Sequence, residues 1–246
     1  MAPFGRGRIS SSKFDEGETE MKHLKFALFL SLASFGPVGT SAQEMKYPPV
    51  SEYLMPQDAE IALAKSAAPD NISGKATIKV LTASGFNVVH EGDNGFVCLV
   101  MRGFGAPTFT PTEFRNLVYD AKLRAPICFD PQAAQTVVPY YELRHKLGLE
   151  GKSPDEIAKS IQAAYSNGSL PKRDKVSFAY MWSADQILGP AGHWHPHMMV
   201  FCPHYENSML GGNQGNAPGP VVTDDAGTPL AVVVIRVDDN LAIKAR

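Results

Sequence analysis

The stretch that decides the fold is DPQAAQTVVPYYELRHKLGLEGKSPDEIAKSIQAAYSNG, residues 130–168. Asp130-Pro131 is typical of a helix N-cap followed by proline at the first helical position. The helix that this pair starts runs towards Leu147 and is interrupted at Pro139. A second start signal, the capping box at residues 153–156, begins another helix, which Asn167-Gly168 ends. The middle of the chain is therefore predicted to be helical.

Strand-like segments flank this helical middle on both sides. A short amphipathic helix at Gln57–Ala68 comes first. Apolar runs typical of strands then occupy residues 76–81, 86–90, 96–102, 176–182, 198–202 and 230–237. Strands before and after a helical middle predict an α+β domain with a mostly antiparallel sheet and two to three helices inserted mid-chain. The last strands could also insert parallel.

The connections between the first strands complete the fold prediction. Residues 91–95 are Glu-Gly-Asp-Asn-Gly, which tolerate the positive φ of a hairpin turn, so we expect a β-meander in which 86–90 pairs with 96–102. The Gly-, Pro- and Thr-rich residues 103–112 and the Gly- and Asn-rich residues 211–220 are predicted to be loops.

The N-terminal region has the order of a cleavable secretory signal peptide. Lys22, His23 and Lys25 form a basic start, Phe26–Phe35 is a short apolar run, and Thr40-Ser41-Ala42 is a small-residue cleavage site. Acidic residues precede this segment, which is unusual for a signal peptide. We therefore expect residues 1–20 to be an upstream extension, 21–42 the signal peptide, and 43–246 a single globular domain.

Composition limits where such a protein acts and what it binds. After the signal, no apolar run reaches the 18 or so residues that a membrane helix needs, so stable membrane insertion is not expected. The chain carries 23 Lys and Arg against 25 Asp and Glu, with no block of like charge, which argues against a nucleic-acid partner. These features predict a soluble protein that is secreted or periplasmic.

The three cysteines are Cys98, Cys128 and Cys202. In an oxidising compartment any two of them could form a disulfide, and three buried thiols are the alternative. We expect Cys98 to pair with Cys128, because both lie in runs that read as neighbouring core elements.

The common signatures of secreted hydrolases and nucleotide-binding proteins are absent. Residues 148–153 resemble the end of a phosphate-binding loop, but Lys146 stands where the motif needs glycine. The chain also has no G-x-S-x-G elbow and no H-E-x-x-H pair.

One segment could bind a metal. His193, His195 and His197 alternate along an extended stretch, and Cys202, His204 and Glu206 follow, so that four of the seven histidines lie within twelve residues. Residues two apart on a strand point to the same side about 6.6 Å apart, close enough for two imidazoles to share one ion. Zinc suits imidazole and carboxylate, whereas a set with Cys202 would favour copper. The alternative is that these histidines are solvated on an exposed loop.

Three segments resemble secreted bacterial proteins of no known activity. They are Asn94–Val100, Pro126–Asp130 and Trp194–Met199. The resemblance implies export and assigns no cofactor or catalytic residue.

Two hypotheses about function follow. The first, which the absence of catalytic motifs favours, is an exported binding or interaction domain without catalysis. The second is a divalent-metal protein, or a metal-dependent enzyme, that uses His193, His195 and His197.

Overall fold

The computed structural model describes residues 47–105, 118–188, 192–211, 219–222 and 225–246. They belong to a compact unit that spans residues 45–246. One sheet runs through it in the order β2-β1-β3-β4-β5-β6-β8-β7. Its strands are β1 (Thr77–Thr82), β2 (Gly85–His90), β3 (Val97–Gly105), β4 (Val118–Phe129), β5 (Ser177–Met181), β6 (His197–Phe201), β7 (Val221–Val222) and β8 (Val232–Arg236).

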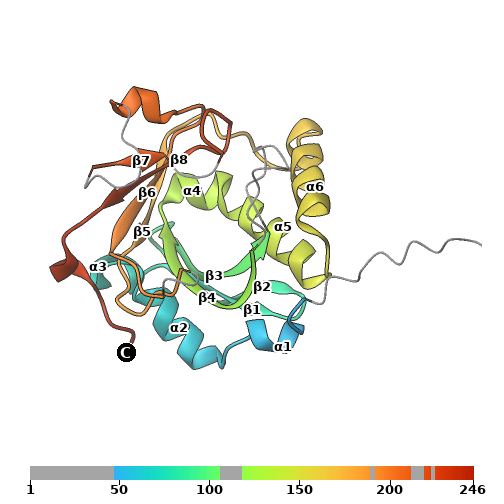
Figure 1. Cartoon of the computed structure of the whole chain (residues 1–246). Helices are drawn as coiled ribbons and strands as arrows, with labels where there is room; N and C mark the ends of the chain where they lie inside the picture. The colour runs from blue at the N-terminus through green and yellow to red at the C-terminus, as the bar shows by residue number, and fades with distance from the viewer. Residues whose placement is uncertain (1–46, 106–117, 189–191, 212–218, 223–224) are drawn as a thin grey trace, which may run out of the picture. The chain divides into compact units, whose positions relative to one another are not determined.

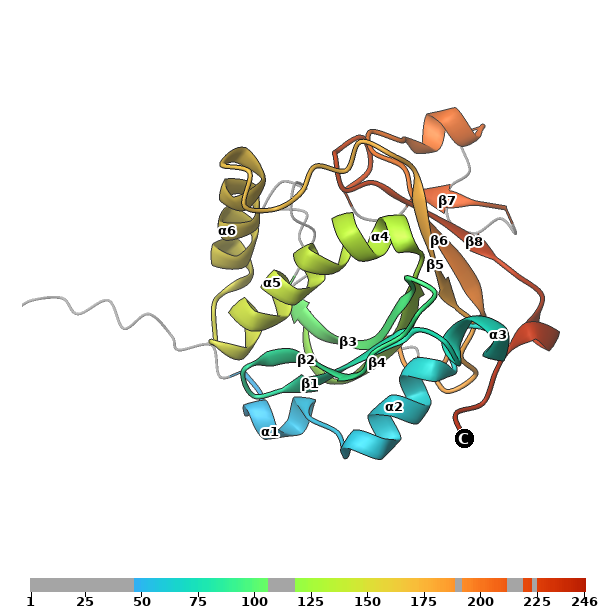
Figure 2. The ribbon, with the colours of Figure 1, turned by 180° about the vertical axis from the view of Figure 1, so that it is seen from behind.

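Helices cover both faces of the first half of this sheet. α4 (Pro131–Thr136), α5 (Val138–Leu149) and α6 (Pro154–Ser166) lie between β4 and β5 in the chain; α1 (Val50–Tyr53), α2 (Gln57–Lys65) and α3 (Asp70–Ser73) precede the sheet. Figures 1 and 2 show β3 and β4 between α4 and α5 on one side and α1 and α2 on the other. The predicted α+β class with a mostly antiparallel sheet is confirmed. The described residues hold six α-helices, slightly more than expected.

The alternation of side chains along β3 and β4 explains these two layers. Leu99, Ile127 and Phe129 face the main core, which α4, α5 and α6 cover. Val100 and Cys128 face the opposite way, against Leu63 and Ala64 of α2 and the alanines that follow this helix. Successive side chains of a strand point to opposite faces, so one pair of strands serves both cores.

The predicted start and stop signals of the helices are borne out. The Ala133 amide donates to Asp130 Oδ1 at 2.6 Å, and Ser153 and Glu156 form both hydrogen bonds of the capping box. The helix after Asp130 is interrupted as expected: α4 ends at Thr136, α5 begins at Val138, and Val137 joins them. Pro139 has no backbone N–H and cannot continue the hydrogen-bond pattern of α4.

The predicted β-meander is wrong at its second turn. β2 pairs antiparallel with β1 through a tight turn, but β3 lies on the other side of β1 and runs parallel to it. Residues 91–96 therefore cross past the start of β1. There the amides of Asp93 and Asn94 donate to the Lys75 carbonyl, and Asn94 Nδ2 donates to the Ile72 carbonyl at 2.8 Å.

Gly92 allows this crossing. A Cβ on Gly92 would lie 2.3 Å from the carbonyl carbon of Ala76 and from the carbonyl oxygen of Lys75. We expect Gly92→Ala to lower the free energy of unfolding by about 1–3 kcal/mol, because two backbones must move apart. Urea unfolding measures the loss, with Glu91→Ala, an exposed neighbour, as the control. Equal stabilities of the two variants would contradict the close crossing.

One strand is longer than predicted and another was not predicted. β3 continues to Gly105, into the segment predicted as a loop, and β4 runs from Val118 to Phe129. A register shift lies between Met101 and Gly103, where Arg102 leaves the ladder. Residues 106–112 of the predicted loop, and 212–218 of the later one, lie outside the described residues.

Cys98 and Cys128 lie directly opposite each other in the β3–β4 ladder and form a disulfide. This is the pairing expected from the sequence. Both residues are fully buried, and Cys202 is a free, partly buried thiol.

Within the described part of the chain, no helix is both long and apolar enough to cross a membrane. The expected extension, signal peptide and cleavage site at residues 1–42 lie outside the described residues.

Candidate functional site

The first half of the predicted metal segment lies at the start of β6. His193 is exposed, and His195 Nδ1 donates to Asp239 Oδ1 at 2.8 Å. His197 is 3% exposed; its Nδ1 donates to the His195 carbonyl at 2.8 Å, and its ring packs against Trp194. Burial lowers the pKa of His197 to about 4, so this imidazole is neutral at pH 7.

The second half lies beyond the other end of β6. Cys202 packs against the cluster of Val222, Ala231 and Val233. His204 Nδ1 lies 3.2 Å from the Gly227 carbonyl, and Glu206 is exposed beside the same glycine. His197 is the first residue of β6 and Cys202 follows its last residue, so these two side chains lie roughly 16 Å apart along the strand.

The structure therefore does not bring the six predicted ligands together. Among the described residues, no group of three or more His, Cys, Asp or Glu side chains could hold one metal ion. His195 and His197 are each held by a hydrogen bond from Nδ1, to Asp239 and to the His195 carbonyl.

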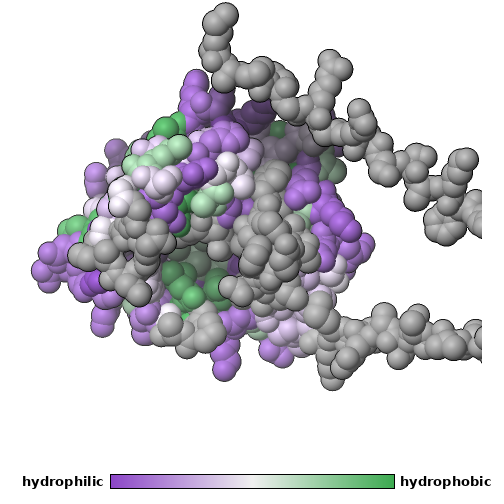
Figure 3. All heavy atoms as spheres, turned by 45° about the horizontal axis from the view of Figure 1, so that its top comes forward, coloured by the Kyte–Doolittle hydropathy of each residue, from purple (hydrophilic) through white to green (hydrophobic). Residues whose placement is uncertain are grey.

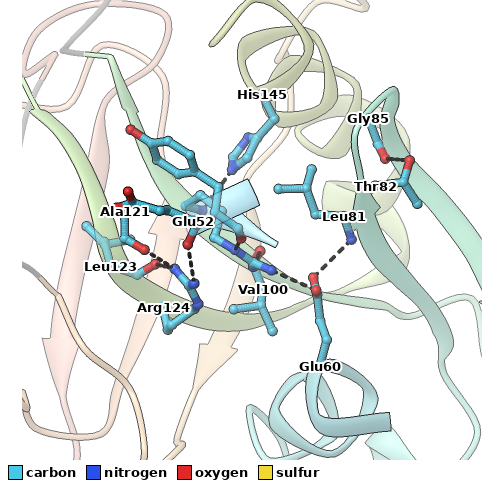
Figure 4. Close-up of polar contacts among 12 residues, drawn as sticks. Glu52, Glu60, Leu81, Thr82, Gly85, Val100, Ala121, Leu123, Arg124 and His145 are labelled. Carbon is cyan, nitrogen blue, oxygen red and sulfur yellow. Dashed lines mark hydrogen bonds and ion pairs between the residues drawn. The ribbon is translucent and has the colours of Figure 1, made fainter. Parts of the chain in front are cut away.

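A buried polar network links α2, β3 and α5 (Figure 4). Arg102 Nη2 and Glu60 Oε2 form an ion pair at 2.7 Å, and both side chains are inaccessible to solvent. Arg102 also donates to the Tyr53 and Val100 carbonyls, while Glu60 Oε1 accepts from the Leu81 amide. The amide of Arg102, freed at the register shift, donates to His145 Nε2 at 2.9 Å.

This network is fully paired, which points to stability rather than ligand binding. Burial lowers the pKa of Arg102 to about 10, against the opposing effect of Glu60, so the guanidinium is charged at pH 7. Burial lowers the pKa of His145 to about 3, and the charges of Arg144 and Arg102 act in the same direction. His145 is thus neutral, with Nδ1 on the Tyr141 carbonyl and Nε2 accepting.

A different arginine is buried without such partners. Arg173 lies in the segment that joins α6 to β5 and is 8% exposed. Its Nε and Nη2 are shielded from solvent and make no hydrogen bond. These two nitrogens share one edge of the guanidinium, the fork that binds carboxylate or phosphate with two parallel hydrogen bonds. Two aromatic rings hold the guanidinium in place: its carbon, Arg173 Cζ, lies 4.8 Å from the centre of the Tyr140 ring and 5.6 Å from the centre of the Phe201 ring.

Other polar atoms around Arg173 also lack partners. Ser177 Oγ is buried and makes no hydrogen bond, and the Tyr165 hydroxyl, also buried, has no partner at ordinary hydrogen-bond geometry but lies close enough to Arg173 to interact with its guanidinium. Burial raises the pKa of Tyr165, Arg173 opposes this rise through its charge and that side-chain contact, and Asp225 adds to it. We call Arg173, Tyr140, Tyr165, Ser177 and Phe201 the arginine cluster. It combines one buried cation, two further hydroxyl groups and aromatic walls.

The side of the molecule at the top of Figure 1 has a visible depression. The segment between α6 and β5 crosses the top of Figure 1, and Figure 3 brings that side forward. Figure 3 shows a hollow with hydrophobic residues at its centre.

No family model, curated protein or solved structure matches the chain.

No pattern in the sequence indicated the arginine cluster. Arg173 stands in Pro171-Lys172-Arg173-Asp174-Lys175, which has the composition of a charged surface turn, and its neighbours Lys172 and Asp174 are indeed exposed. No spacing rule joins Arg173 to Tyr140, Tyr165 and Phe201, which come from three other elements.

Proposed function

We propose that this chain is an exported binding domain that takes up a small anion at Arg173. Export rests on the signal-like segment Met21–Ala42 and on the resemblance to secreted bacterial proteins. The observation that carries the binding function is the unpaired, buried Nε/Nη2 edge of Arg173.

An unpaired buried guanidinium is costly. Taking a charge out of water without a partner costs several kcal/mol, and native proteins rarely leave such donors unused. An anion on the fork would recover this cost through two charge-assisted hydrogen bonds, each contributing about 1.5–3 kcal/mol. Tyr165 and Ser177 would add neutral donors beside it.

The test is calorimetric titration of the purified protein with acetate, chloride and phosphate, together with thermal unfolding. Binding of an anion at one hundred times its dissociation constant should add about 2.7 kcal/mol to the free energy of unfolding. We expect Arg173→Gln to weaken binding by about 100-fold or more, and Arg173→Lys by less, since lysine keeps the charge but not the fork.

Lys172→Gln is the matched control. It removes the same charge from the neighbouring residue, whose side chain is exposed. Anion binding that both glutamine variants weaken equally would indicate a general charge effect and contradict the site. If the effects of Arg173→Gln and Asp225→Asn on the free energy of unfolding are strongly coupled, and no anion stabilises the protein, Asp225 is the partner of Arg173 instead of a bound anion.

A second candidate function is metal binding at His195 and His197. The observation in its favour is that each Nδ1–H donates to an oxygen, from Asp239 or from the His195 backbone, which leaves each Nε2 lone pair available. Metal-binding histidines are commonly oriented in this way by hydrogen bonds to the other ring nitrogen.

Titration of metal-stripped protein with zinc and with copper at pH 7.5 tests this second candidate. A real site gives near-stoichiometric uptake that His195→Ala abolishes and His90→Ala leaves unchanged. Weak or superstoichiometric uptake, or uptake that survives His195→Ala, would mean that these histidines are an ordinary surface group.

A further inference from the structure

We propose that the ligand of the arginine cluster is an amphipathic monocarboxylate, with its carboxylate on Arg173 and its apolar part along the helix-covered side of β6 and β7. This inference rests on the proposed anion-binding function and names its ligand class. It depends on three further observations: the charge around the fork, the apolar side chains next to it, and its shielding from water.

The local charge suits a monoanion. Arg173 is the cation that the cluster itself supplies, and the Asp225 carboxylate acts on the same Tyr165 hydroxyl as Arg173 does. Asp225 is itself buried. A dianion such as phosphate would bring two negative charges against one guanidinium beside a carboxylate, in a setting where water screens little. A carboxylate matches the fork in shape and in charge.

The apolar part of the ligand has a defined direction. Along β6, Phe201 and Met199 point to the same face of the sheet, about 7 Å apart. Met199 pairs with Val234 of β8, which pairs in turn with Val221 of β7. Met199 and Val221 pack against the main core but remain only partly buried. Phe201, the ring beside the Arg173 guanidinium, is buried, and the strip that continues from it to Met199 and Val221 has surface left to cover.

The surroundings of the fork favour an apolar ligand over a hydrated one. Tyr140 and Phe201 present ring faces to the guanidinium, and neither Nε nor Nη2 is accessible to water. A ligand can reach these nitrogens only after the side chains over them have moved. The apolar part of a carboxylate would cover the partly buried side chains of Met199 and Val221, which a small hydrated ion would leave exposed to water.

The experiment compares five probes on the purified protein: acetate, octanoate, octanamide, malonate and inorganic phosphate. We expect octanoate to bind at least 10-fold more tightly than acetate, and both octanamide and the dianions to bind more weakly than octanoate. Arg173→Gln should reduce octanoate affinity about 100-fold. Because the fork is shielded, octanoate should associate well below the diffusion limit in stopped-flow measurements.

A pair of variants on β6 separates the carboxylate from the apolar part. Met199→Gln should weaken octanoate about 10-fold and leave acetate unchanged, whereas Met198→Gln, on the opposite face of the same strand, should change neither. Circular dichroism of both variants checks that the fold is kept.

The outcomes distinguish this inference from the proposed function. Acetate binding that depends on Arg173, with no gain for octanoate, would overturn the inference and leave the anion site standing. Phosphate or malonate binding more tightly than octanoate would do the same. If no anion binds, the inference and the proposed function both fail.

Discussion

Glu60→Gln is expected to lower the free energy of unfolding by about 3–5 kcal/mol, measured by urea unfolding at pH 7. The substitution keeps the shape of the side chain but leaves the Arg102 guanidinium without a counter-charge, in a position that solvent does not reach. Replacing both partners of a buried ion pair by apolar residues often costs little stability. Removing only one partner costs far more, because the other charge stays buried without compensation.

The partly exposed pair Lys79–Glu142 is the matched control. Its atoms lie 2.5 Å apart, but the two side chains are 20% and 33% exposed. Glu142→Gln should therefore cost less than about 1 kcal/mol. Losses of similar size for Glu60→Gln and Glu142→Gln would show that burial of the Arg102 pair has no special effect on stability.

The second large effect is a loss of stability in acid that depends on His145. The folded pKa is about 3, well below the ordinary value of 6.5, so between these values the unfolded chain binds a proton that the folded chain does not. Stability is then greatest above pH 6.5 and falls by about 1.4 kcal/mol for each pH unit below it. From pH 6.5 to pH 4.5 this residue accounts for about 2 kcal/mol.

His145→Gln isolates this contribution. Glutamine keeps an acceptor for the Arg102 amide and does not titrate, so the variant should lose less stability than the wild type between pH 7 and pH 4.5. Urea unfolding at both pH values gives the difference directly. Parallel pH dependences of the two proteins would mean that His145 is protonated in the folded state without cost.

Local signals predicted the helical part of the fold well. Asp130, Pro139, Ser153 and Asn167 each act on backbone groups within a few residues, so their effect can be read from the sequence. The β-meander failed for the opposite reason. Residues 91–95 suit a hairpin turn and equally suit a crossing, and only the contact of Gly92 with the start of β1 decides between them.

The candidate site shows the same limit more strongly. The histidines at 193, 195 and 197 form a dense set in the sequence, but β6 places them apart from Cys202, His204 and Glu206. Arg173 looks like one charge among several in an exposed turn. Its significance depends on Tyr140, Tyr165 and Phe201, from elements that meet only when the sheet and helices have packed.

The disulfide between Cys98 and Cys128 lies beneath α2, in the middle of the sheet, and neither cysteine has any exposed surface. Oxidants and reductants of molecular size therefore cannot reach the sulfur atoms in the folded protein. The bond has to form while α2 is still away from the sheet, and it can be reduced only when the chain opens. The folded protein thus keeps the redox state of the compartment in which it folded.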